Sequence, residues 1–114
     1  SKEIAHLAVK ALDDKLARDI QILKTDKVTV LADYFILCTA GNSTHGKTLA
    51  DEVDKVLSQA GEQPLRREGY RSGGWTLLDF GCVVVHIFSE EMRSFYSLDR
   101  LWSDAEKIDY KDFL

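Results

Sequence analysis

The segment from Gly41 to Thr48 has the residue types and the spacing of a phosphate-binding loop. Its sequence, GNSTHGKT, matches the pattern GxxxxGK[ST] and lies between an apolar run and a helix-like pattern, as that motif requires. In the motif, backbone N–H groups at a helix start hold phosphates, while the lysine and the hydroxyl, here Lys47 and Thr48, reach the terminal phosphates and Mg²⁺. One hypothesis is therefore a nucleotide-binding or nucleotidyl-transfer enzyme.

The same segment also fits a plain strand–turn–helix connection. In this interpretation Gly41 makes the turn, Asn42 or Ser43 caps the helix, and Lys47 is solvated. Nucleotide-hydrolysing domains with the motif are larger, and the aspartate that would hold the metal, Asp79, lies in a predicted antiparallel hairpin. No residue that would orient a water molecule or act as an arginine finger can be identified. The plain connection is favoured, and we expect no cofactor.

The histidines and cysteines show no catalytic or metal-binding spacing. Cys38 and Cys82 lie in separate apolar runs without a CxxC pattern, which predicts buried free thiols. His86 lies in the middle of a predicted strand, where a hydrogen-bonded structural histidine is favoured over a base or a ligand. No strand carries two alternating acidic residues that would bind Mg²⁺. We expect neither catalytic residues nor a metal site.

The composition indicates one globular domain. The chain has 114 residues, and its hydrophobic content of 45% and charged content of 30% are ordinary. A net charge of −4 does not suggest direct binding to nucleic acid, but it is compatible with a basic protein partner. No apolar run reaches the roughly 18–20 residues of a membrane span, and the N-terminal region has no secretion signal. We therefore expect a cytoplasmic protein.

The hydrophobic pattern predicts the order α-β-β-α-β-β-β-α. Helices are expected over 2–17, over 43–60 and from 89 onward, and strands over 19–23, 34–40, 65–68, 75–80 and 82–88. This order predicts a single α/β (α+β) domain, with a mixed sheet of about five strands and helices packed on it. The domain is expected to span residues 1–106, and 107–114 to form a charged, loosely attached tail.

The two strands on either side of Gly81 are expected to form a hairpin. Side chains alternate along a strand, so Trp75, Leu77 and Asp79 share one face of the first arm. Leu78 and Phe80 share the other face and are expected in the core.

Several stretches spread over nearly the whole chain carry a more specific pattern. They are ADYFI at 32–36, GNS at 41–43, LADEV at 49–53, EG at 68–69, WTLLDFG at 75–81, VVVHIF at 83–88 and RSFYSLDRLW at 93–102. In these stretches the chain resembles the ribosomal silencing factor family (RsfS, also called Iojap). It departs from the family at Cys82, where an acidic residue is common, and in the amino-acid sequence of residues 45–48.

The resemblance implies a domain related in fold to nucleotidyltransferases but without their catalytic carboxylates, and hence a role without catalysis. Family members bind the large ribosomal subunit through a basic protein on its intersubunit face, the fourteenth in the large-subunit series. The bound factor sterically blocks joining of the small subunit and represses translation when nutrients are scarce. Organellar relatives act in large-subunit biogenesis, which is a further alternative. The resemblance also implies a possible homodimer.

The residues expected to bind the partner combine aromatic and charged side chains on the hairpin and on the final segment. Trp75, Leu77 and Asp79 come first, because an apolar pair beside a carboxylate suits a basic protein surface. The remaining candidates are Glu68, Tyr70, Arg93, Tyr96, Asp99 and Trp102.

Overall fold

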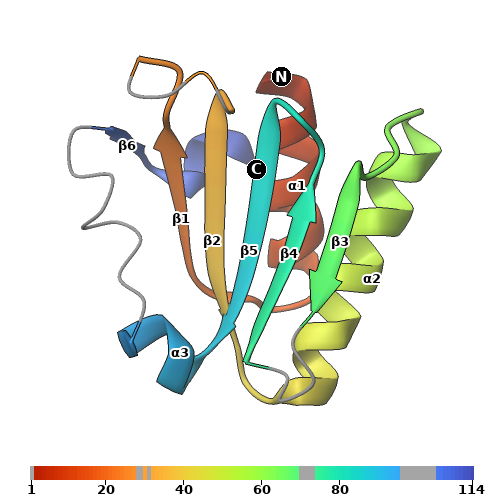
Figure 1. The fold of residues 1–114 in the computed structure, drawn as a ribbon, viewed down its shortest axis with the longest axis vertical. Helices are drawn as coiled ribbons and strands as arrows, with labels where there is room; N and C mark the ends of the chain where they lie inside the picture. Colours follow the sequence, from red (N-terminus) through yellow and green to blue (C-terminus); the bar gives the residue numbers. More distant parts are fainter. Residues whose placement is uncertain (1, 28–29, 31, 70–73, 96–104) are drawn as a thin grey trace.

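The computed structural model describes residues 2–27, 30, 32–69, 74–95 and 105–114. Over these residues the chain forms an α+β domain with a mixed six-stranded sheet (Figure 1). In chain order the elements are α1 (Lys2–Asp14), β1 (Arg18–Lys24), β2 (Tyr34–Ala40), α2 (Ser43–Gln59), β3 (Arg66–Gly69), β4 (Trp75–Asp79), β5 (Val83–Ser89), α3 (Glu90–Phe95), β6 (Glu106–Ile108) and the 3-10 helix η1 (Tyr110–Phe113).

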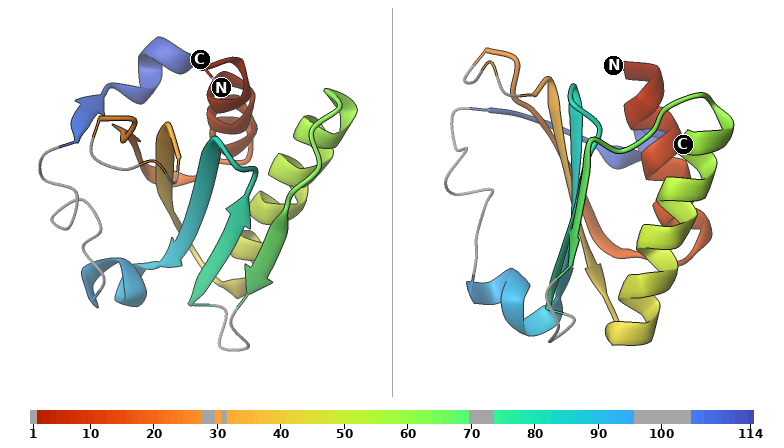
Figure 2. Two further views of the ribbon diagram at one scale, coloured as in Figure 1. Left: turned by 45° about the horizontal axis from the view of Figure 1, so that its top comes forward. Right: turned by 45° about the vertical axis from the view of Figure 1, so that its right-hand side comes forward.

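The strands lie in the order β3-β4-β5-β2-β1-β6, with β2 and β5 parallel and every other neighbouring pair antiparallel. Helices α1 and α2 cover one face of this sheet, while α3 lies on the other side (Figure 2). The predicted fold class and element order are confirmed through α3. The structure adds a sixth strand, which comes from the segment expected to be a tail.

The main core lies between the sheet and the pair α1 and α2. Along β4, Leu78 is fully buried in this core; Val85 of β5 lies opposite it, and Ile36 of β2 lies on the other side of Val85. The β4–β5 hairpin turns at Gly81, whose φ of 86° lies in the left-handed region that glycine adopts without strain. The predicted hairpin and the core positions of its first arm are confirmed.

The expected loose attachment of residues 107–114 is wrong. Residues Glu106–Ile108 pair with β1 as strand β6, and the aromatic ring of Phe113 is 3% exposed. That ring stacks on His6 of α1 with a centroid distance of 4.3 Å and meets Tyr34 edge-on at 5.8 Å. The charged residues of this segment are interspersed with apolar side chains that complete the core. The prediction of a loose tail relied on the number of charges and overlooked these apolar residues.

Candidate functional site

The segment 41–48 does not form a phosphate-binding loop. Helix α2 already begins at Ser43, and the side chain of Asn42 caps it by accepting the N–H of His45 at 2.8 Å. The N–H of Gly46 donates to the carbonyl of Asn42 at 2.9 Å, and the N–H of Gly41 donates to Nδ1 of His45 at 2.8 Å. These donors are therefore used within the chain, whereas a phosphate loop directs them at its ligand.

A shallow cavity of about 260 Å³ lies beside Lys47, between α2 and the strands β3 and β4. Its second cation, Arg67, is neutralised by two carboxylates of α2: Asp51 at 2.6 Å and Asp54 at 3.1 Å. The hydrogen bond to Asp51 is the main cause that raises the pKa of Arg67. Thr48 is exposed on α2. The arrangement stabilises the packing of β3 on α2 and does not concentrate positive charge for a phosphate.

The strongest group of predicted site residues lies on the sheet face opposite α1 and α2, over β3 and β4. Trp75 packs in a second apolar cluster on that face, whereas Leu78 points into the main core, so the predicted division of this strand is confirmed. In the β3–β4 pairing, Glu68 lies opposite Leu77 and Arg66 lies opposite Asp79. We call Arg66, Glu68, Trp75, Leu77 and Asp79 together the β3–β4 face.

Asp79 is held by two contacts at the edge of this face. Its Oδ1 accepts the N–H of Gly81 at 2.8 Å, and its Oδ2 lies 3.5 Å from a guanidinium nitrogen of Arg66. Arg66 also lies 3.6 Å from Glu68, so two carboxylates share one guanidinium and the β3–β4 face has a net formal charge of −1. The side chain of Asp79 keeps 21% of its surface exposed, so it remains within reach of a partner.

Trp75 is half-buried, and its indole is fixed by neighbours on β5. The indole Nε1–H donates to Nδ1 of His86 at 3.2 Å, and the ring tilts against Phe88 with a centroid distance of 5.0 Å. Burial lowers the pKa of His86 to about 4, partly offset by the charge of Asp79, so the imidazole is neutral near pH 7. The prediction of a hydrogen-bonded structural histidine is confirmed, but its link to Trp75 was missed.

Arg93 lies on α3, and its guanidinium contacts strands β1 and β2. Its guanidinium donates to Oγ1 of Thr39 on β2 at 3.1 Å and to the carbonyl of Asp19 on β1 at 3.0 Å. Asp19 has a φ of 50° in an irregular part of β1, and this bond helps to hold that backbone. Arg93 is thus not brought together with the β3–β4 face. The other candidates, Tyr70, Tyr96, Asp99 and Trp102, lie outside the described residues.

A sequence model of the family described as "ribosomal silencing factor during starvation" (RsfS) matches residues 1–114. The chain belongs to the ribosomal silencing factor family. Among its relatives, the silencing factor of Halalkalibacterium halodurans is 36% identical over 96% of this chain and 93% of its own length. That of Bacillus subtilis is 37% identical over 95% of this chain and 92% of its own length. A solved structure of a Chromobacterium violaceum protein, 39% identical, superposes with a TM-score of 0.85 over 89% of this chain and 84% of its own.

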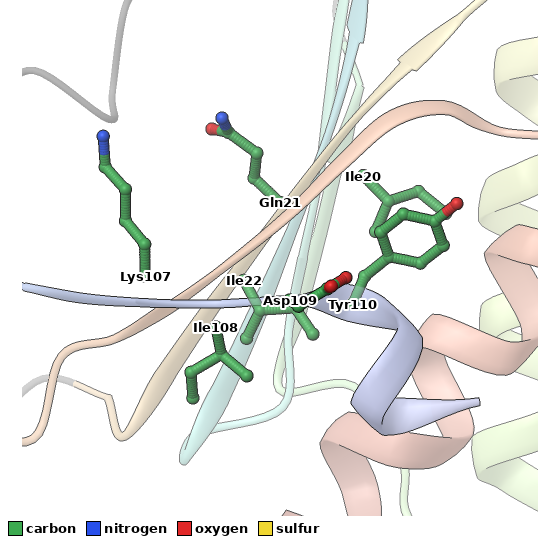
Figure 3. Close-up of a pocket in the computed structure, with 7 residues that line it drawn as sticks. All are labelled: Ile20, Gln21, Ile22, Lys107, Ile108, Asp109 and Tyr110. Atoms are coloured by element: carbon green, nitrogen blue, oxygen red, sulfur yellow. The ribbon is translucent and has the colours of Figure 1, made fainter.

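Outside the β3–β4 face, this silencing-factor domain has a cavity of about 230 Å³ between β1 and β6 (Figure 3). Its lining mixes three isoleucines with polar side chains, of which Gln21 and Lys107 extend along one side of the strands. Over the described parts of the chain no group of three or more His, Cys, Asp or Glu side chains could hold a metal ion, and no helix is long and apolar enough to cross a membrane.

Proposed function

We propose that the chain silences ribosomes by binding the large ribosomal subunit through its β3–β4 face and sterically blocking the small subunit. The partner would be a basic protein on the intersubunit face, the fourteenth of the large-subunit series. Translation falls because joined ribosomes do not form. The observation that carries this proposal is the joint placement of Trp75, Leu77, Asp79 and Glu68 on one sheet face that α1 and α2 leave uncovered.

The chemistry of the β3–β4 face fits such a partner. A half-buried indole beside an aliphatic side chain offers a rigid apolar anchor, and tryptophan is among the residues whose truncation costs most at interfaces. The two carboxylates around this anchor outnumber the one guanidinium, and the chain as a whole carries −4. Negative charge at the rim speeds encounter with a basic surface and sets the register of docking.

The proposed role is steric and requires no catalysis. The enzymatic alternative depended on Lys47 and Thr48 in a phosphate loop, and the capped start of α2 provides no such loop. A titration with labelled nucleotide and Mg²⁺ tests this alternative directly. Micromolar binding that disappears in Lys47→Ala would replace the silencing proposal with a nucleotide-dependent one.

The main experiment mixes purified protein with isolated large and small subunits and separates the products on a sucrose gradient. We expect the wild-type protein to migrate with large subunits and to reduce the full-ribosome peak. Trp75→Ala should lose both effects, whereas Lys47→Ala, changed at an exposed position on α2, should keep them. If subunits associate equally well in excess wild-type protein, the proposed function is wrong.

A further inference from the structure

The hydrogen bond between Trp75 and His86 fixes the tautomer of the histidine. Because Nδ1 accepts the indole N–H, the proton of the neutral ring must be on Nε2. His86 is 4% exposed, and its Nε2 has no hydrogen-bond partner among the residues that the structure describes. Within the described part of the chain the ring thus leaves a buried donor unpaired, which proteins generally avoid.

Packing alone does not explain a histidine at position 86. A leucine or a phenylalanine would fill a similar volume on this apolar face and would remove the unpaired Nε2–H, but it would also take away the acceptor of the Trp75 indole N–H. The feature that only the imidazole provides here is an acceptor for the indole of Trp75. That acceptor is available near pH 7 because burial keeps the ring neutral.

The imidazole is itself held in place by aromatic neighbours. It stacks on Phe88 with a centroid distance of 6.0 Å and an interplanar angle of 8°, and it tilts against Phe35 at 5.2 Å. Strand pairing adds a further constraint, because His86 lies between Leu77 of β4 and Leu37 of β2. An acceptor held in this way restricts the orientation of the indole that donates to it.

We propose that His86 is a positioning residue of the β3–β4 face: it holds the indole of Trp75 in the orientation that the ribosomal partner binds. This inference rests on the proposed function and adds a residue that the partner does not need to touch. A side chain that is ordered before docking loses less rotational freedom on binding, so the complex is tighter. The Nε2–H, which has no partner among the described residues, is the cost of that order.

The test compares His86→Leu, which removes the acceptor, with His86→Asn, whose side-chain oxygen can occupy the place of Nδ1. The indole N–H resonance of Trp75, assigned by its absence in Trp75→Phe, is followed by NMR for exchange with solvent. We expect faster exchange and roughly fivefold weaker binding to isolated large subunits in His86→Leu, in line with the loss of one hydrogen bond. His86→Asn should stay close to wild type, and His86→Phe serves as the apolar variant if leucine prevents folding.

A double-mutant cycle separates positioning from a general structural effect. In a Trp75→Phe background, His86→Leu should cause no further loss of binding, because the indole that it positions is absent. An equal loss in both backgrounds, or unchanged indole exchange in His86→Leu, would overturn the inference and leave the proposed function intact. If the wild-type protein does not bind large subunits at all, the proposed function fails, and the docking role of His86 fails with it.

Discussion

Glu68 of β3 lies directly opposite Leu77 of β4, so a carboxylate and an aliphatic side chain are neighbours on the β3–β4 face. Directly paired residues of antiparallel strands have Cβ atoms about 5 Å apart. The pairing thus places a carboxylate that could contact a basic partner next to an apolar side chain. The two residues come from different strands, β3 and β4.

Leu77 and Leu78 are adjacent in the sequence and should respond oppositely to truncation. Leu78→Ala should reduce the free energy of unfolding by roughly 2–5 kcal/mol, because Leu78 is fully buried in the main core. Leu77→Ala should change stability much less and should weaken binding to large subunits. Urea unfolding and a pelleting assay on both variants provide the two measurements. A Leu77→Ala protein that binds like wild type would remove this residue from the interface.

Asp79 has a structural and a proposed docking role, and two substitutions separate them. Asp79→Asn keeps an oxygen that can accept the N–H of Gly81 but removes the charge, so it should fold normally and bind large subunits with a weaker dependence on salt. Asp79→Arg removes that acceptor and places a like charge near Arg66, so it should also lose about 1 kcal/mol of stability. Binding measured at two salt concentrations, together with urea unfolding, checks both expectations.

The stability of the fold should fall as the pH decreases from about 6.5 to about 4, in part because of His86. The pKa of its imidazole is lowered from 6.5 to about 4 by burial, so the unfolded chain takes up a proton at a higher pH than the folded one. Above pH 6.5 the imidazole is neutral in both states and does not reduce stability. By pH 4 the protonation of the unfolded chain has lowered the free energy of unfolding by roughly 3 kcal/mol. Unfolding curves at several pH values should show a flatter dependence in His86→Leu. Identical slopes in the two proteins would contradict this assignment.

Phe113 should contribute to stability although it is next to the last residue of the sequence. Its ring is buried against His6 and Tyr34, so Phe113→Ala should cost roughly 3–5 kcal/mol. Leu114→Ala is the matched control, because Leu114 is 53% exposed and its truncation should have little effect. Thermal unfolding of the two variants distinguishes them, and similar midpoints would mean that η1 is not part of the cooperative unit.

Much of the fold could be predicted because local patterns and tertiary packing agree. Neighbouring residues alone determine three of its features. They are the alternation around Leu78 in β4, the turn at Gly81 and the cap of α2 at Asn42. The alternation also placed Trp75, Leu77 and Asp79 on one face. The relation to nucleotidyltransferases, the partner and the role of each site residue stay predictions.

Three features could not be predicted, because each depends on residues far apart in the sequence. Phe113 is ordered by contact with α1, a hundred residues away, and β6 is ordered by pairing with β1. The bond between Trp75 and His86 depends on the register of β4 against β5, which the sequence does not specify to the residue.

The stacking of His6 on Phe113 has a practical consequence for measuring the proposed complex. It brings the first and last elements of the chain together on the sheet side that carries α1, which is opposite the side of the β3–β4 face (Figure 2). A biotin or a fluorophore attached at either end would therefore leave the β3–β4 face open to solution. An immobilised protein could capture ribosomal subunits without its tether competing for the surface under study.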